Sequence, residues 1–537
     1  MCYFNALKLR RFVALNVQIL KECEGLHIMA VKILMLVLFF GIMILVGIRS
    51  RKHATNVNDF VLGGRSVGPW LTAFAYGTSY FSAVVFIGYA GQFGWKYGIS
   101  ATWIGLGNAF LGSLLAWVVL GRRTRVMTNH LSAATMPDYF GKRYDSKALK
   151  IAASAIAFIF LIPYTASVYN GLSRLFGMAF DIPYTVCVIV MAVLTGVYVI
   201  LGGYMATAIN DFIQGIIMLF GICAVIVSVL NGQGGFMQAI MNLSELESDI
   251  PATLGQKGAF TSFFGPDPMN LLGVVILTSL GTWGLPQMVH KFYTIKDERA
   301  IKTGTIVSTV FAIIVSGGCY FLGGFARLFD DPAIYSATGS VIYDSIIPFM
   351  LSKLPDILIG IVVMLVLSAS MSTLSSLVLT SSSTLTLDLL KDNVIKKMDE
   401  KKQLLTMRIL IVFFIVISVV IALDPPTFIA QLMGISWGAL AGAFLAPFLY
   451  GLYWKKVTKA AVWASFAAGV GITVLNLFFK FIASPINAGA AAMIAGLIVV
   501  PIVSLITKKM PDKQVEEIFS CYNETVTVRK KKSLSEK

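Results

Sequence analysis

Residues Gly77-Thr78-Ser79-Tyr80-Phe81-Ser82 interrupt an apolar segment, near 68–90, that is otherwise long enough to cross a membrane as one helix. Five apolar segments later, Gly281-Thr282-Trp283-Gly284-Leu285-Pro286-Gln287 interrupts a second segment in the same way. Glycine loosens a helix and proline removes a backbone donor, so carbonyl oxygens at such breaks can turn toward an ion or a solute. Either break alone is also compatible with a structural kink. Interrupted segments at matching positions of two halves indicate the inverted repeats of a secondary transporter.

The composition is that of an all-α integral membrane protein. Of the 537 residues, 57% are hydrophobic and only 13% are charged, and the mean hydropathy is +0.79, whereas soluble proteins carry roughly 25% charged residues. Apolar runs of about 20 residues, the length that crosses a bilayer, recur along the whole chain and predict about 13 transmembrane helices. They lie near 32–50, 68–90, 100–120, 149–176, 183–201, 206–231, 270–290, 304–328, 351–387, 404–423, 428–453, 457–480 and 487–507.

The net charge of +16 comes from lysine and arginine residues that concentrate in alternate loops. Arg122 to Arg125, Lys291 to Lys302 and Lys391 to Lys402 are examples, while the intervening loops are acidic or neutral, as at Glu245 and Asp330. By the positive-inside rule the basic loops are cytoplasmic. This pattern predicts a multi-pass protein of the cell membrane, surrounded by lipid bilayer, with its N-terminus outside and its C-terminus in the cytoplasm. The basic charge therefore does not indicate a nucleic-acid partner.

Residues 1–28 do not fit this charge pattern, because they are basic yet precede a helix that is predicted to start outside. We predict that they are an extension outside the working protein and that translation starts at Met29. Glu24-Gly25 lies just upstream and can be encoded by a purine-rich run suited to ribosome binding. An amphipathic surface helix and a signal peptide are the alternatives, although no small-residue cleavage site follows.

No enzyme signature is found in the sequence. The six cysteines show no Cys-x-x-Cys spacing and the four histidines no metal-ligand spacing. The motifs of hydrolases, zinc proteases and phosphate-binding loops are absent from the sequence. The segments near 232–269 and after 508 are too short for soluble domains of ordinary size. The classes that remain are a channel and a transporter.

A hydroxyl-rich stretch, Ala369-Ser370-Met371-Ser372-Thr373-Leu374-Ser375-Ser376, lies within the apolar run 351–387. At about 100° per residue, Ala369, Ser372, Thr373, Ser375 and Ser376 share one face of a helix, spread over roughly 160°. Hydroxyl oxygens have the hardness that sodium prefers, and in hydrocarbon such a face needs partners. Close packing between membrane helices is the alternative explanation for these small residues.

The chain resembles the sodium:solute symporter family, which includes bacterial proline, pantothenate, sialic acid and sugar symporters. The resemblance runs from about Asp59 to about Gly469. It rests on Phe60 to Trp70, on Met136 to Phe140, on Gly202 to Ala206, on Asn210 to Gln214 and on the hydroxyl-rich stretch with its trailing Asp388-Leu389-Leu390. The chain departs from the family's usual residues at Tyr204, Asn210 and Ala461-Val462.

This resemblance implies the leucine-transporter type of fold, with two inverted repeats of five helices, one leading helix and two trailing helices. The predicted divisions are a leading helix at 29–52, a first repeat at 66–232, a second repeat at 268–454, two trailing helices at 457–507 and a basic cytoplasmic tail at 508–537.

The resemblance also implies the ligands of a sodium site. These are the carbonyl oxygens of Thr78, Phe81 and Ala369 and the hydroxyls of Ser372 and Thr373. Some family members have a second sodium site, which would correspond here to Asp211, Ser375 and Ser376. An ionisable residue at membrane depth is costly and is by default a functional candidate. Water near the cytoplasmic end of the helix could instead accommodate Asp211 without a functional role.

The solute is expected beside the two broken helices, near the middle of the bilayer. The predicted wall consists of Tyr80, Ser82, Tyr164, Thr278, Thr282, Trp283 and Gln287. Proline symporters have an aspartate at the position of Tyr80, and sialic acid symporters an arginine at that of Tyr164. A site without fixed charge favours a neutral or zwitterionic small solute, such as an amino acid, or a monocarboxylate.

The prediction is therefore a sodium-coupled symporter that takes up a small organic solute by alternating access. Two alternatives stay open at this point. A proton could be the coupling ion, with Asp211 as its carrier. The chain could also be a channel or, because no signalling domain follows, less readily a transporter-like sensor.

Overall fold

The computed structural model describes residues 30–180, 182–391, 394–395, 398–425 and 428–523. In these ranges the chain forms helices and turns and no β-strand, which confirms the all-α prediction. The predicted extension 1–28 lies outside the described residues, as does the last part of the predicted tail, 524–537.

The helix bounds follow the predicted apolar runs. The long helices are Ala30–Ser50, α8 (Lys147–Phe180), α9 (Tyr184–Gly232), α16 (Asp356–Thr384), α17 (Glu400–Leu423), α18 (Ile429–Tyr453), α19 (Lys459–Phe479) and α20 (Pro485–Ile506). The shorter ones are α2 (Val57–Leu62), α3 (Pro69–Tyr80), α4 (Ala90–Tyr97), α5 (Thr102–Gly107), α6 (Arg122–His130), α7 (Met136–Arg143), α10 (Phe236–Ser244), α11 (Pro268–Gly281), α12 (Pro286–Tyr293), α13 (Arg299–Ala312), α14 (Gly318–Gly323), α15 (Tyr343–Ser352) and α21 (Asp512–Ser520). The π-helical segments are η3 (Val84–Tyr89), η5 (Asn108–Leu115), η6 (Trp117–Gly121), η9 (Ile313–Gly317) and η12 (Leu385–Leu390).

Eleven helical stretches within the described residues are long and apolar enough to cross a membrane. Two of them, Val84–His130 and Tyr184–Gly232, are 47 and 49 residues long, about twice what one crossing needs. Each contains a glycine with positive φ, Gly98 at 60° and Gly203 at 55°. The count of about 13 transmembrane helices stays a prediction. If each of these two long stretches crosses the membrane twice, with a break at its glycine, the 11 stretches give that number.

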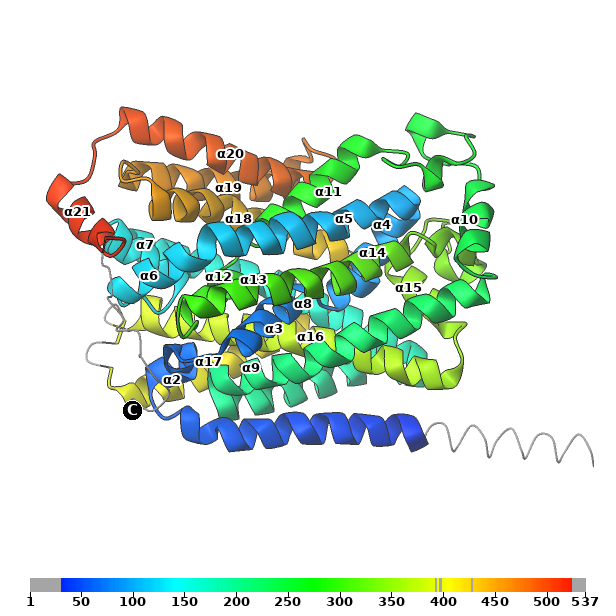
Figure 1. Ribbon diagram of the computed structural model, residues 1–537, viewed down its shortest axis with the longest axis horizontal. Coiled ribbons are helices and arrows are strands. Elements are labelled where there is room, and N and C mark those ends of the chain that lie inside the picture. Colours follow the sequence, from blue (N-terminus) through cyan, green and yellow to red (C-terminus); the bar gives the residue numbers. More distant parts are fainter. Residues whose placement is uncertain (1–29, 181, 392–393, 396–397, 426–427, 524–537) are drawn as a thin grey trace, which may run out of the picture.

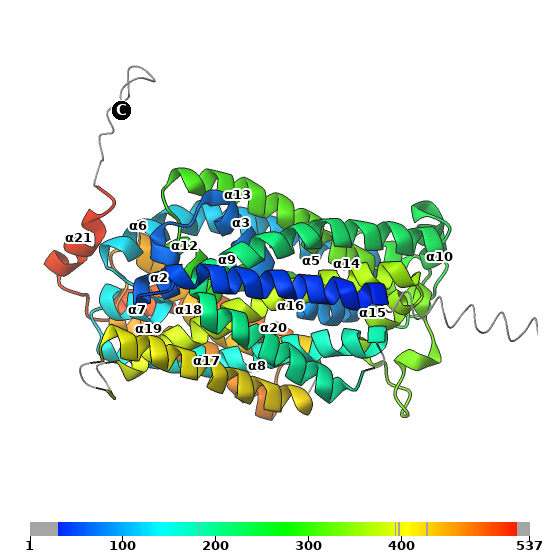
Figure 2. The ribbon, with the colours of Figure 1, turned by 90° about the horizontal axis from the view of Figure 1, so that it is seen from below.

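The long helices run side by side along the longest axis of the molecule (Figure 1). The helix Ala30–Ser50 lies across the outside of α9 (Figure 2), where Met43 contacts Gln214. Large apolar side chains are exposed on the outer faces, as at Val37 (62%) and Phe220 (75%). Such a belt is stable only in an apolar surrounding, so the protein is a multi-pass membrane protein.

Both predicted breaks are present. α3 ends at Tyr80, Phe81 has an extended backbone (φ −101°, ψ 121°), and helical structure resumes near η3. α11 ends at Gly281, and α12 starts with Pro286 in its first turn, after Leu285 in an extended conformation. Proline fits that first turn because its missing N–H would have no helical partner there.

Candidate functional site

The break after α3 faces the hydroxyl-rich face of α16. Ser372 Oγ lies 3.0 Å from the carbonyl oxygen of Thr78, and Thr373 Oγ1 lies 3.4 Å from that of Phe81. The carbonyl oxygen of Ala369 lies 3.0 Å from the Ser372 hydroxyl and 3.1 Å from that of Thr373. The structure therefore gathers all five groups of the predicted first sodium site at one junction between the two helices.

This junction follows from the way α3 ends. The last carbonyl groups of a helix have no partner within the helix, so they need donors from elsewhere. Here the hydroxyls of Ser372 and Thr373 supply them, and all five residues are at most 3% exposed. A hydroxyl carries two lone pairs beside its proton, so the same oxygens can rotate to face a cation.

The cluster consists of neutral oxygens. Protein sites for divalent ions recruit carboxylates, whereas carbonyl and hydroxyl oxygens alone suit a singly charged hard cation better. Within the described ranges, no group of three or more His, Cys, Asp or Glu side chains could hold a metal ion. A small monovalent cation such as sodium is thus the ion that this junction fits.

Two of the three residues predicted for a second sodium site, Asp211 and Ser376, lie beside a buried lysine. Lys291 Nζ, from α12, lies 3.0 Å from Ser376 Oγ and 3.5 Å from Asp211 Oδ2. Both charged side chains are buried, with exposed fractions of 2% for Lys291 and 0% for Asp211. The hydroxyl of Ser375 does not join them, because it donates to the carbonyl of Ser372 on its own helix.

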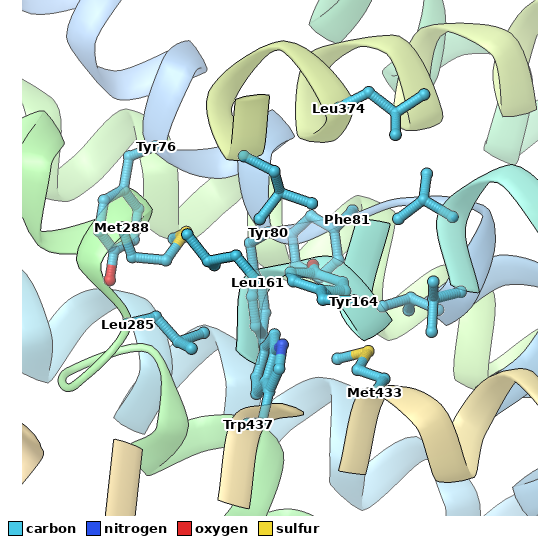
Figure 3. Close-up of a cluster of buried hydrophobic side chains, with 14 of the residues drawn as sticks. Tyr76, Tyr80, Phe81, Leu161, Tyr164, Leu285, Met288, Leu374, Met433 and Trp437 are labelled. Carbon is cyan, nitrogen blue, oxygen red and sulfur yellow. The ribbon is translucent and has the colours of Figure 1, made fainter. Parts of the chain in front are cut away.

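Three aromatic residues lie next to the first break. The ring of Trp437, on α18, is 5.7 Å from that of Tyr80 and 5.8 Å from that of Tyr164. Figure 3 shows the three side chains together between α3, α8 and α18. The Tyr80 hydroxyl donates to the carbonyl of Thr278, which links the two broken helices. The hydroxyl of Tyr164 and the indole nitrogen of Trp437 are buried and form no well-aligned hydrogen bond among the described residues, although the Tyr164 hydroxyl lies within reach of Trp437 and Ser82.

The other predicted wall residues differ in how their polar atoms are used. Thr282 Oγ1 donates to Gly112 and Trp283 Nε1 to Leu111, so both bind the backbone of η5. Ser82 Oγ accepts the N–H of Val84 at the restart of the helix. Thr278 Oγ1 donates to Val274 within α11, while Gln287 is buried and its Oε1 has no partner in the described part of the chain. Of the predicted wall, only Tyr164 and Gln287 keep a buried polar atom without a well-aligned partner among the described residues.

The sequence profile of the sodium:solute symporter family matches residues 60–469. The chain belongs to this family. A sodium/proline symporter of Staphylococcus aureus (strain JH9) is 29% identical over 503 residues, which cover 89% of this chain and 93% of the relative.

Two solved structures of other transporters are similar. A Na⁺-coupled sialic acid symporter, in a substrate-bound outward-open state, superposes with a TM-score of 0.69 and 15% identity over 89% of this chain and 98% of that one. A nucleobase-cation-symport-1 family transporter, in a closed conformation with bromovinylhydantoin bound, superposes with a TM-score of 0.53 and 12% sequence identity. This superposition covers 86% of this chain and 97% of that one. At such low sequence identities, the structural similarity establishes that this chain shares the fold of these transporters. The predictions of family, fold class and sodium-coupled solute symport are confirmed.

Two residues of this symporter were missed by sequence reasoning. Lys291 was assigned to a cytoplasmic loop, but it lies inside α12 with 1% of its surface exposed. Polar residues at helical spacing, Gln287, His290, Lys291 and Thr294, mark one buried face and could have revealed it. Trp437 is one aromatic residue among many in an apolar helix, and no sequence signal distinguishes it.

Two of the family motifs meet at the end of the symporter where α2 and α7 lie. Asp138, from Met136 to Phe140, pairs with Lys150 at 2.8 Å and with Lys142 at 2.9 Å, and Lys150 also pairs with Asp388 at 3.2 Å. These residues line a polar cavity of about 510 Å³. Although burial alone raises a carboxyl pKa, the charges of Lys150 and Lys142 hold the pKa of Asp138 below its ordinary value.

Proposed function

We propose that this symporter moves one small solute inward with sodium bound at Thr78, Phe81, Ala369, Ser372 and Thr373. The observation that carries the proposal is the contact of the Ser372 and Thr373 hydroxyls with the carbonyl oxygens released by the break in α3. A cation at this junction would bind α3 to α16 directly, in place of hydrogen bonds between them.

Bound sodium would then hold α3 and α16 together, and its release would let the two helices move apart. Bound from outside, it stabilises the arrangement in which α3 and α16 are held together, and its release into the cytoplasm allows them to separate. Each sodium ion that enters down about 100 mV contributes about 2.3 kcal/mol, which sustains a solute gradient of roughly 50-fold before the sodium gradient is added. Tyr80, Tyr164 and Trp437 are buried on all sides, so solute access requires such a movement.

For the solute we propose a small amino acid or monocarboxylate. Two donors beside the break, the hydroxyl of Tyr164 and the indole N–H of Trp437, lie within reach of each other without a well-aligned hydrogen bond, and a carboxylate between them would accept both. The aromatic rings would pack against a small apolar body. The S. aureus relative is named a sodium/proline symporter and the structural relative a sialic acid symporter, and both of these solutes carry a carboxylate.

For the orientation we propose that the end with α2, α7 and the charged cavity faces the cytoplasm of the cell. The basic loops support this placement. The N-terminal end of the helix Ala30–Ser50 would then be outside, and α21 inside.

A screen of purified protein by thermal unfolding tests the proposal. Amino acids including proline, monocarboxylates and neutral sugars are added in sodium chloride and, separately, in potassium chloride. We expect stabilisation by a carboxylate-bearing compound in sodium only, because a bound ligand shifts the unfolding equilibrium by mass action. Labelled uptake of that compound into proteoliposomes should then follow an inward sodium gradient. Stabilisation that is equal in both salts, or uptake driven by a proton gradient in sodium-free buffer, would contradict the proposal.

A further inference from the structure

Lys291 is a buried basic residue, with 1% of its surface exposed. α12, on which it lies, contacts both α3 and α16 (Figure 1). Its ammonium group is 3.0 Å from Ser376 Oγ, 3.5 Å from Asp211 Oδ2 and 5.2 Å from the centre of the Tyr204 ring. A carboxylate and an aromatic face from α9 and a hydroxyl oxygen from α16 thus surround the positive charge that α12 carries.

The same groups are those that would hold a second cation. Asp211 supplies the negative charge and Ser376 a hydroxyl oxygen, while Ser376 Oγ also lies 2.8 Å from Ser79 Oγ at the end of α3. The second position is therefore connected to the first break, as a coupled cation site should be. A sodium ion beside Asp211 would stand within a few ångströms of the ammonium, and like charges so close together repel strongly in a buried site.

We propose that the Lys291 ammonium takes the place of the second sodium ion, so that one sodium is bound per chain. The inference rests on the proposed function for the first ion. Lys291 is then a positioning residue: it neutralises Asp211, connects α12 to α16 through Ser376, and travels with the protein instead of being released. The charge moved per cycle would be that of one sodium plus the charge of the solute.

The count of bound sodium ions tests this proposal. The probe is radioactive sodium, bound to the purified full-length protein at saturation, without any solute. We expect one ion per chain for the native protein and for Lys291→Arg, which keeps the positive charge. In Lys291→Met the carboxylate of Asp211 loses its partner, and we expect two ions per chain, because sodium can then enter beside Asp211 and Ser376. Lys291→Met combined with Asp211→Asn has neither charge and should again bind one.

The outcomes separate the two proposals. Two ions on the native protein, or no additional ion on a folded Lys291→Met variant, would overturn the role of Lys291. If Lys291→Met does not fold, the count is made on Lys291→Gln, which also lacks the charge and for which two ions are expected; one ion on folded Lys291→Gln, or more than one on the native protein or the combined variant, contradicts the inference. No ion on the native protein would contradict the first sodium site, and a gained site in Lys291→Met would still support the role of Lys291.

Discussion

Two positions on the same face of α16, about one turn apart, differ in the chemistry that they present. At Ser372 and Thr373 only hydroxyl and carbonyl oxygens meet, with no charge. At Ser376 a buried carboxylate and a buried ammonium meet. The first position has no charge of its own, so its oxygens can bind a cation and release it again. The second already contains its cation, and the difference indicates that one helix can combine an exchangeable ion with a permanent one.

The largest expected loss of stability comes from removing one of the two charges at the second position. Asp211→Asn leaves the Lys291 ammonium without its carboxylate in a buried site, and removal of one partner of such a pair costs about 3–5 kcal/mol. We expect a large drop in the thermal midpoint, most of which Lys291→Met should restore in the combined variant. A combined variant as unstable as Asp211→Asn alone would show that the pair is not what holds this region together.

A smaller effect should separate the two neighbouring serines. Ser376→Ala removes a partner of both Lys291 and Ser79, and a hydrogen bond to a charged group contributes about 1.5–3 kcal/mol. Ser375→Ala is the comparison variant, since its hydroxyl donates to the Ser372 carbonyl and lies beside the Tyr198 hydroxyl, both of them neutral groups. Equal midpoints for the two variants would argue against Ser376 as a link between helices.

Substitutions at the neutral position, Ser372 and Thr373, should change the affinity for sodium more than the stability of the protein. Loss of a single hydroxyl ligand in Thr373→Ala should weaken sodium binding roughly tenfold, equivalent to about 1.4 kcal/mol. Thr373→Ser keeps the hydroxyl and should bind sodium as the native protein does. Sodium titrations of the thermal midpoint distinguish the two, and equally weak binding by both would point to lost packing instead of a lost ligand.

The smallest expected loss of stability concerns the ion pairs of Asp138 with Lys150 and Lys142, because the two lysines are partly exposed to water. Because the pKa of Asp138 is lowered in the folded state, its pairing stabilises the protein above the ordinary carboxyl value of 3.8 and is lost as the pH falls through the lower folded value. The native midpoint should therefore decline more steeply in acid than that of Asp138→Asn. Parallel declines would contradict a stabilising role for the Lys150 and Lys142 pairs.

The meeting of the groups at the neutral position could be predicted from the sequence. Glycine, proline and hydroxyl residues inside apolar runs are local signals, and the family pattern adds which carbonyls face which hydroxyls. Backbone carbonyls do not depend on side-chain identity, and the structure brings the five groups from Thr78 to Thr373 together at one junction; their role as sodium ligands stays a prediction. The membrane spans followed for the same reason, because hydrophobicity over about 20 residues is a local property.

The charged position could not be predicted, since it depends on how three helices pack. A lysine near the end of an apolar run is most simply a loop residue by the positive-inside rule. Only the restart of the helix at Pro286 and its packing against α16 turn Lys291 inward, toward Asp211 from α9. Trp437 is a similar case, because its indole meets Tyr80 and Tyr164 across three separate helices.

The most direct test of the account is the binding of radioactive sodium to the double variant Ser372→Ala with Thr373→Ala. Ser382→Ala with Ser383→Ala is the matched control, because these hydroxyls lie on the same helix, are also buried and, among the described residues, donate to the carbonyls of Leu379 and Thr380 of that helix. We predict that the native protein and the control each bind one sodium ion, and that the double variant binds none. Sodium binding to the double variant with native affinity would contradict the central claim that this junction holds the coupling ion.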